Sequence, residues 1–184
     1  MSHGTIILGQ VLKLMPRAHV ESLDKTYRTG RPSRELSSWS QFGALVFAQL
    51  AGRHSLRDVV TAMASQSEAL APLGVTPPKR STLAEANERR PAALYHSLFA
   101  ALYARCQAVA PSHGFRFKNP LFSVDSTTIS LCLNLFPWAR FRTAKGAIKV
   151  HTLLDHAGHL PAFVVITEGK QSDIKGRIAQ IRRQ

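Results

Sequence analysis

The chain has 184 residues, of which 45% are hydrophobic, so it can bury a core and is not wholly disordered. Its 24 Lys and Arg outnumber its 11 Asp and Glu, for a formal net charge of +13, which favours nucleic acid as partner and then an anionic membrane surface. The longest strongly apolar stretch, residues 43–51, is too short to span a bilayer, and the N-terminus lacks the pattern of a signal peptide.

Residues 1–110 have helical hydrophobic periodicity. A first helix is expected from about residue 6 and ends at Pro16, and a second is expected over about 38–51 and ends at Gly52. Ser55 stands three residues before Asp58, a spacing typical of a capping box, and predicts the start of a third helix. Two helices joined by a Gly-containing turn resemble a helix-turn-helix step, although any helical bundle produces the same pattern.

The basic stretch 25–34 predicts a loop, and its arginines are expected to contact phosphates rather than read sequence. Thr82 precedes Glu85 by three residues, which predicts a capping box at the start of a short helix. Pro91 breaks or restarts that helix, and a further helix is expected to run to about Val109.

After about Pro120 the period becomes short and β-branched, which predicts three strands, over 121–131, 146–155 and 160–167. A Gly-containing hairpin loop, 156–159, joins the last two. Ser172 is expected to cap a final basic helix. The order predicts an α+β chain, with a helical N-terminal domain over 1–110 and a second domain over 111–184.

Asp125 is the candidate catalytic residue because it lies inside an apolar, β-branched strand. A carboxylate in a strand core loses solvation unless a cation or a hydrogen-bond network binds it. One interpretation is that Asp125 ligates Mg²⁺, since hard cations prefer oxygen ligands and two such ions can hold both oxygens of a phosphoryl transfer. The alternative is a strand-end Asp that bonds to neighbouring hydroxyls or amides.

The stretch VDSTTISLCLNLFPWARFRTAKGAIKVHTLLDHAGHLPAFVVITEGKQSD resembles the start of the catalytic domain of bacterial insertion-sequence transposases, in particular the insertion-sequence-four family. The segments SWSQFGALVFAQLAGRHSLRDVV and RSTLAEANERRP resemble the helical domain that precedes it in some members. The resemblance extends from about residue 4 to 175. It implies a ribonuclease-H-like fold whose Asp-Asp-Glu triad binds two Mg²⁺ ions for DNA strand cleavage and joining.

The resemblance matches Asp125 to the first Asp of that triad, as catalytic residue and metal ligand. The other two members are expected in an Asp-Arg-Gly-Tyr-like motif and a Tyr-Arg-Glu-like motif, and neither occurs in this sequence. We therefore predict a C-terminally truncated copy, with three strands and a helix of the ribonuclease-H-like domain, that is inactive in isolation. Three later carboxylates fit turn, solvation and helix-start roles instead: Asp155, Glu168 and Asp173.

Two groups of cations are candidate DNA contacts. One group surrounds the short helix at 82–90, which also carries Asn87, and its alternative role is an exposed polar helix face. The other group lies between the first two predicted strands, with His151, and its alternative role is to charge the strand edges. The candidate residues are Lys79, Arg80, Arg89, Arg90, Arg140, Arg142, Lys145 and Lys149.

Other residues predict no chemistry. Trp39 and Trp138 are expected to pack in or cap the core, and the pair His156 and His159 makes a poor metal site on its own. The two cysteines form no CxxC, which excludes a zinc ribbon and fits reduced thiols.

The expected partner is double-stranded DNA at transposon ends, with a homodimer or co-assembly with an intact transposase, in the bacterial cytoplasm at the nucleoid and away from membranes. Two alternatives stay open. One is a catalytically dead DNA-binding remnant that competes with or regulates an intact enzyme, and the other is a general basic nucleic-acid-binding protein.

Overall fold

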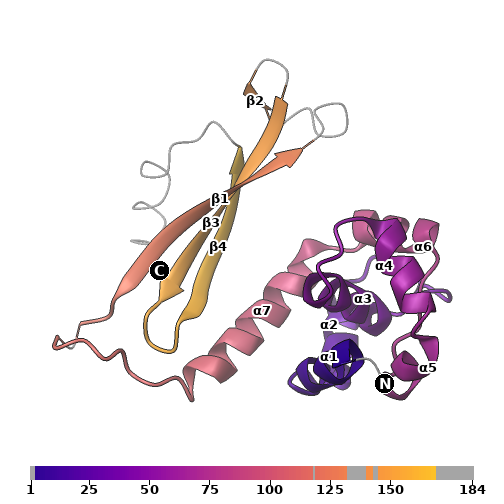
Figure 1. The fold of residues 1–184 in the computed structure, drawn as a ribbon, viewed down its shortest axis with the longest axis horizontal. Coiled ribbons are helices and arrows are strands. Elements are labelled where there is room, and N and C mark those ends of the chain that lie inside the picture. The colour runs from indigo at the N-terminus through magenta and orange to yellow at the C-terminus, as the bar shows by residue number, and fades with distance from the viewer. Residues whose placement is uncertain (1–2, 118, 132–139, 143–144, 169–184) are drawn as a thin grey trace. The chain divides into compact units, whose positions relative to one another are not determined.

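The computed structural model describes residues 3–117, 119–131, 140–142 and 145–168. Within this part of the chain, seven α-helices and one 3₁₀ helix are followed by four β-strands, which confirms the predicted α+β class (Figure 1). The chain divides into two compact units, Met1–Leu102 and Tyr103–Gln184, hereafter the helical unit and the sheet unit. The last helix contributes residues to both units.

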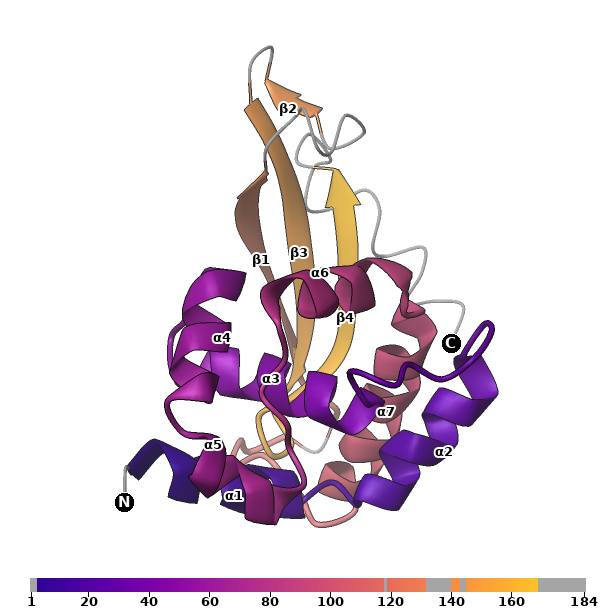
Figure 2. The same cartoon turned by 90° about the vertical axis from the view of Figure 1, so that its right-hand side faces the viewer.

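The helical unit contains more helices than the sequence pattern predicts. The helix that follows Pro16 and the short one after Gln66 were not anticipated, and the first of these takes in the first three residues of the expected basic loop. The helices are α1 (His3–Lys13), α2 (Arg17–Tyr27), α3 (Ser38–Leu50), α4 (Leu56–Ala64), α5 (Ser67–Leu70), the 3₁₀ helix η1 (Ala71–Leu73), α6 (Arg80–Arg89) and α7 (Ala92–Gln107) (Figure 2).

Hydroxyl groups cap two of these helices. The Ser37 side chain accepts a hydrogen bond from the Ser40 amide at the start of α3, and the Ser55 side chain accepts one from the Asp58 amide, which confirms the predicted start of α4. The prediction for Thr82 was wrong. α6 begins two residues earlier, at Arg80, with Lys79 as its N-cap, and Thr82 Oγ1 inside the helix donates to Glu35 Oε2 at 2.9 Å.

The core of the helical unit is one apolar cluster with contributions from α1 to α7. Trp39 is only 4% exposed, and its indole nitrogen donates to the Leu73 carbonyl at 2.9 Å, which confirms its predicted packing role. Tyr27 and Ser97 join α2 to α7 through their hydroxyl groups at 2.7 Å. The largest fully buried apolar side chains are Leu8, Val20, Leu36, Met63, Leu70, Val75 and Leu83.

The sheet unit carries an antiparallel sheet in which β3 (Lys145–Asp155) pairs with β1 (Phe122–Leu131), β2 (Arg140–Arg142) and β4 (Leu160–Glu168). The three predicted strands are confirmed, and β2 is an addition. The β3–β4 hairpin loop, also confirmed, has positive φ at Gly158 and His159, and Asp155 Oδ1 accepts from the Ala157 amide at 2.8 Å. The predicted final helix, Trp138 and Asp173 lie outside the described residues.

Gly43 allows α3 to approach the segment that follows η1. A Cβ atom at this position would lie 2.8 Å from Cγ2 and 3.0 Å from Cγ1 of Val75, which is itself buried. Alanine normally favours a helix over glycine by about 1 kcal/mol. Here the steric overlap opposes that preference.

We expect Gly43→Ala to lower the free energy of unfolding by about 1–3 kcal/mol, because the tightly packed α3 must shift to admit the methyl group. Urea denaturation followed by circular dichroism measures this change. Gly114→Ala is the control, since nothing lies within 4 Å of its Cβ position. A Gly43→Ala chain as stable as the parent would contradict the close approach.

Candidate nucleic-acid interface and the Asp125 strand

Four of the predicted DNA contacts lie at the two ends of α6. Lys79 and Arg80 stand at its N-terminal end, and both are exposed. Arg89 is exposed in the last turn and forms an ion pair with Glu85 at 2.7 Å, one helical turn earlier. These three side chains lie at the surface, where a phosphate can reach them.

Arg90 has a different environment from its neighbour Arg89. Its guanidinium donates to the Ser37 carbonyl at 3.2 Å, to Gln41 Oε1 at 2.6 Å and to the Leu36 carbonyl. Burial lowers the pKa of the Arg90 guanidinium from its ordinary value. Arg90 therefore joins the end of α6 to the start of α3, and its donors are used within the helical unit.

The same network extends to Asn87 of α6. Gln41, which is 1% exposed, donates from Nε2 to Asn87 Oδ1 at 2.6 Å. Burial also raises the pKa of Tyr95, whose hydroxyl interacts electrostatically with Arg90, to about 12. Asn87 thus helps to satisfy a buried amide, and its carbonyl oxygen already accepts one hydrogen bond within the helical unit.

A cleft of about 630 Å³ lies between α6 and the loop that follows α2. Its charged residues balance, because four arginines face four carboxylates, and Arg28 pairs with Asp24 at 3.0 Å. A cleft with balanced charge does not attract an anion as strongly as the exposed cations at its margin. The charged residues lining it are Arg28, Arg31, Arg89, Arg90, Glu21, Asp24, Glu35 and Glu85.

The turn between α3 and α4 contains exposed cations that sequence reasoning did not select. Arg53 in this turn and Arg57 in the first turn of α4 are both exposed, and Gly52 has a positive φ of 59°. α4 packs against both α3 and α6. The helix-turn-helix resemblance of the sequence already pointed to this turn. Arg53 and Arg57 could therefore have been selected as candidate phosphate contacts from the sequence.

The strand register separates Asp125 from the cations expected to accompany it. Asp125 pairs with Thr152, whereas Lys149 pairs with Thr128. Opposed residues of an antiparallel pair share a face and successive residues alternate, so Asp125 and Lys149 lie on opposite faces. Lys149 is therefore not beside Asp125.

Three further candidate cations lie in β2 and at the start of β3, and their side chains fall outside the described parts. They are Arg140, Arg142 and Lys145.

His151 also lies on the face opposite Asp125, because it pairs with Ser126. It is 4% exposed, and its Nε2 is 2.7 Å from Thr167 Oγ1 on β4. This position gives His151 a packing role in the sheet.

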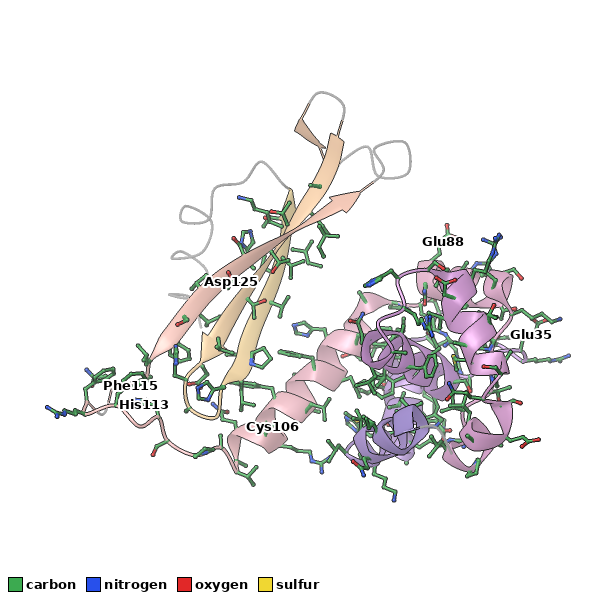
Figure 3. All side chains as sticks on the ribbon, viewed as in Figure 1. Glu35, Glu88, Cys106, His113, Phe115 and Asp125 are labelled. Carbon is green, nitrogen blue, oxygen red and sulfur yellow. The ribbon has the colours of Figure 1, made fainter. Side chains whose placement is uncertain are left out.

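Asp125 lies on β1 as predicted, but its side chain is exposed, so the expectation of a buried strand carboxylate was wrong (Figure 3). The pleat places Ser123 and Thr127 on the same face as Asp125. Among the residues that the structure describes, no group of three His, Cys, Asp or Glu side chains could hold a metal ion. Asp125 can therefore supply one Mg²⁺ ligand, and the described residues do not complete the site.

The register also separates Asp125 from the strand positions of two later acidic residues, Asp155 and Glu168. Asp155 pairs with Phe122, which places it on the opposite face, where it is 8% exposed and bonds to the hairpin loop as predicted. Glu168 on β4 pairs with Ile148 on β3, which in turn pairs with Ile129 on β1. Glu168 is therefore two strands away from Asp125 across the sheet and four residues away along the strand direction. That separation is roughly 16 Å from ordinary sheet spacings, too far for a shared ion.

Comparison with known proteins gives two partial matches. Residues 3–76 match a family model described as "Domain of unknown function (DUF4372)". The chain is also 31% identical over 93 residues to "Probable transposase for insertion sequence element IS5377" from Geobacillus stearothermophilus, a match that covers 50% of this chain. The chain spans about a quarter of that relative's length, 24%. No solved structure matches.

These findings support a distant relation to insertion-sequence transposases. They agree with the resemblance of the sequence at the level of the family. In the described parts of the chain, no helix is long and apolar enough to cross a membrane.

The adjacent residues Arg89 and Arg90 allow a matched test of the network. We expect Arg90→Ala to lower the free energy of unfolding by about 2–3 kcal/mol, because it leaves the buried Gln41 amide and two carbonyls without their charged donor. Arg89→Ala removes only a surface ion pair and is expected to cost less than about 0.5 kcal/mol. Denaturant unfolding measures both, and equal losses would contradict a structural role for Arg90.

Proposed function

We propose that this chain takes part in DNA transposition as a transposase-derived DNA-binding protein. The observation that carries the proposal is the 31% identity to an insertion-sequence transposase over half of the chain. The net charge of +13 supports it, since a cationic surface binds the phosphate backbone. We place its action on double-stranded transposon ends at the bacterial nucleoid.

The helical unit is the DNA-binding element of this proposal. Lys79, Arg80 and Arg89 present exposed cations at both ends of α6, and Arg53 and Arg57 present two more around the α3–α4 turn. The arrangement favours contact with phosphates over reading of bases, because the Asn87 side-chain carbonyl accepts a hydrogen bond and Arg90 donates three inside the unit.

For catalysis we propose that Asp125 corresponds to the first metal-binding carboxylate of transposases. Its exposed position on a strand supports this assignment, because a ligand must be accessible to ion and DNA. The described residues provide no second carboxylate beside it. We therefore propose that this chain alone binds DNA without cleaving it, and that it competes or co-assembles with an intact enzyme.

Duplex binding by the helical unit is expected to weaken as salt increases. Lys79→Gln/Arg80→Gln should reduce the slope of log affinity against log salt by about 2, because two phosphate contacts are lost. Fluorescence anisotropy with a labelled duplex at several salt concentrations measures the slope. Lys13→Gln, an exposed cation at the end of α1, is the control. A flat salt response, or an equal effect of the control, would contradict the proposed contacts.

Strand cleavage by this chain alone is expected to be absent in Mg²⁺ or Mn²⁺, because the described residues give Asp125 no second carboxylate with which to hold the ions of a phosphoryl transfer. A nicking assay on supercoiled plasmid that carries the element's ends measures this, with Asp125→Ala beside the parent. Cleavage abolished by Asp125→Ala would contradict the predicted inactivity and support the ligand assignment. Cleavage that survives the substitution would contradict both.

A further inference from the structure

The loop between α7 and β1 carries two phenylalanines that are not buried. The rings of Phe115 and Phe117 stack with centroids 5.6 Å apart and planes 15° apart, and the residues are 53% and 46% exposed. Both residues belong to the sheet unit. Such exposed aromatic surface is costly unless another molecule covers it.

Three histidines surround the phenylalanine pair. His113 lies against both rings, at centroid distances of 5.6 Å from Phe115 and 5.3 Å from Phe117. His156 of the β3–β4 hairpin meets Phe115 edge-on at 6.1 Å, and His159 meets His156 at 6.0 Å. We call these five residues the aromatic cluster; Figure 3 shows His113 and Phe115 together in the loop that leads into β1.

Hydrogen bonds hold this cluster in place on the sheet unit. His156 Nε2 lies 2.6 Å from Ser123 Oγ of β1, and the His156 amide donates to the Leu121 carbonyl at 3.0 Å. His113 Nε2 lies 3.0 Å from the Asn119 carbonyl oxygen. The rings are therefore preorganised by the start of β1 and the hairpin, which reduces the entropy lost when a ligand binds.

The charge around the cluster is positive. Between Tyr103 and Val124 the sequence has Arg105, Arg116 and Lys118 and no Asp or Glu, and the sheet unit has twelve Lys and Arg against four Asp and Glu. The nearest acid of the hairpin, Asp155, is 8% exposed and accepts from the Ala157 amide. Exposed aromatic rings alternating with cations suit a ligand that carries both flat rings and negative charge.

We propose that the aromatic cluster binds unpaired nucleotides of single-stranded DNA, with bases stacked on Phe115 and Phe117 and phosphates held by Arg116. An aromatic ring stacks on a base only when the base face is free, and pairing and stacking hide that face in a duplex. This inference depends on the proposed function only in its choice of DNA as the nucleic acid. The site is separate from α6, which lies in the helical unit.

The test compares single-stranded and duplex DNA binding by the full chain. Probes are a fluorescein-labelled oligothymidylate of about 12 nucleotides, matching an ordinary single-strand site size, and a duplex of the same length. Two double variants are compared with the parent chain. Phe115→Leu/Phe117→Leu, called the Leu pair, keeps apolar volume but removes the aromatic rings. Phe115→Tyr/Phe117→Tyr, called the Tyr pair, restores the rings. Phe122→Leu is the matched control, since Phe122 is an exposed phenylalanine of the sheet unit outside the cluster.

We expect the Leu pair to weaken oligothymidylate binding roughly tenfold or more, the Tyr pair and Phe122→Leu to stay within about threefold, and duplex binding to change little. A 2-aminopurine base in the oligonucleotide should be quenched by the parent and not by the Leu pair. Arg116→Gln should lower the salt slope by about 1.

Unchanged oligothymidylate binding by the Leu pair would overturn the inference while leaving the proposed function intact if duplex binding persists. Equal losses with Phe122→Leu would overturn it as well. If the Leu pair binds DNA normally but has a lower mass than the parent in sedimentation analysis, the inference is also overturned. The aromatic cluster would then be an interface between two copies of the chain. A parent chain that does not bind the duplex would instead contradict the proposed function.

Discussion

The Arg90 guanidinium is the interaction on which the arrangement of the helical unit depends. It lies where α6 ends and α7 begins, and it donates to two carbonyls before α3 and to Gln41 within α3. Because Gln41 also donates to Asn87, the network connects residues about fifty positions apart through polar groups that are partly buried. Removing any partner leaves another without a hydrogen bond, which makes the network more consequential than the surface ion pairs nearby.

This constraint divides the basic residues of the unit by role. Arg90 and Asn87 are used in structure, whereas Lys79, Arg80 and Arg89 remain exposed. The adjacent residues Arg89 and Arg90 at the end of α6 therefore have different roles, one at the surface and one in the structure of the unit. In the sheet unit the pleat makes a similar division, because it puts Lys149 and His151 on the face opposite Asp125.

The sequence predicted the elements whose signals are local. Ser55 and Asp58 marked the start of α4, Gly158 marked the hairpin, and β-branched runs marked three strands. α2 was missed because Lys25 in its last turn and the cations of the following loop obscured the apolar positions of Val20 and Leu23. Thr82 was assigned as a cap because spacing alone does not show that Glu35, distant in sequence, accepts its hydrogen bond.

The candidate site was less predictable than the fold. Residue type identified Asp125 and the cations near it, but their relative faces depend on strand register, which one-residue shifts would reverse. The exposure of Asp125 likewise depends on what packs against β1. The aromatic cluster combines a loop with a hairpin some forty residues later, a pairing that no local pattern in the sequence indicates.

DNA binding is expected to involve two regions of the chain, the exposed cations of the helical unit and the aromatic cluster of the sheet unit. Hydrogen–deuterium exchange of the full chain, with and without a duplex that ends in a single-stranded overhang, tests both regions in one measurement. We expect slower exchange around residues 53–57 and 79–89 and in the loop at 113–117 when DNA is bound. Unchanged exchange in all three regions when DNA is bound would contradict this expectation.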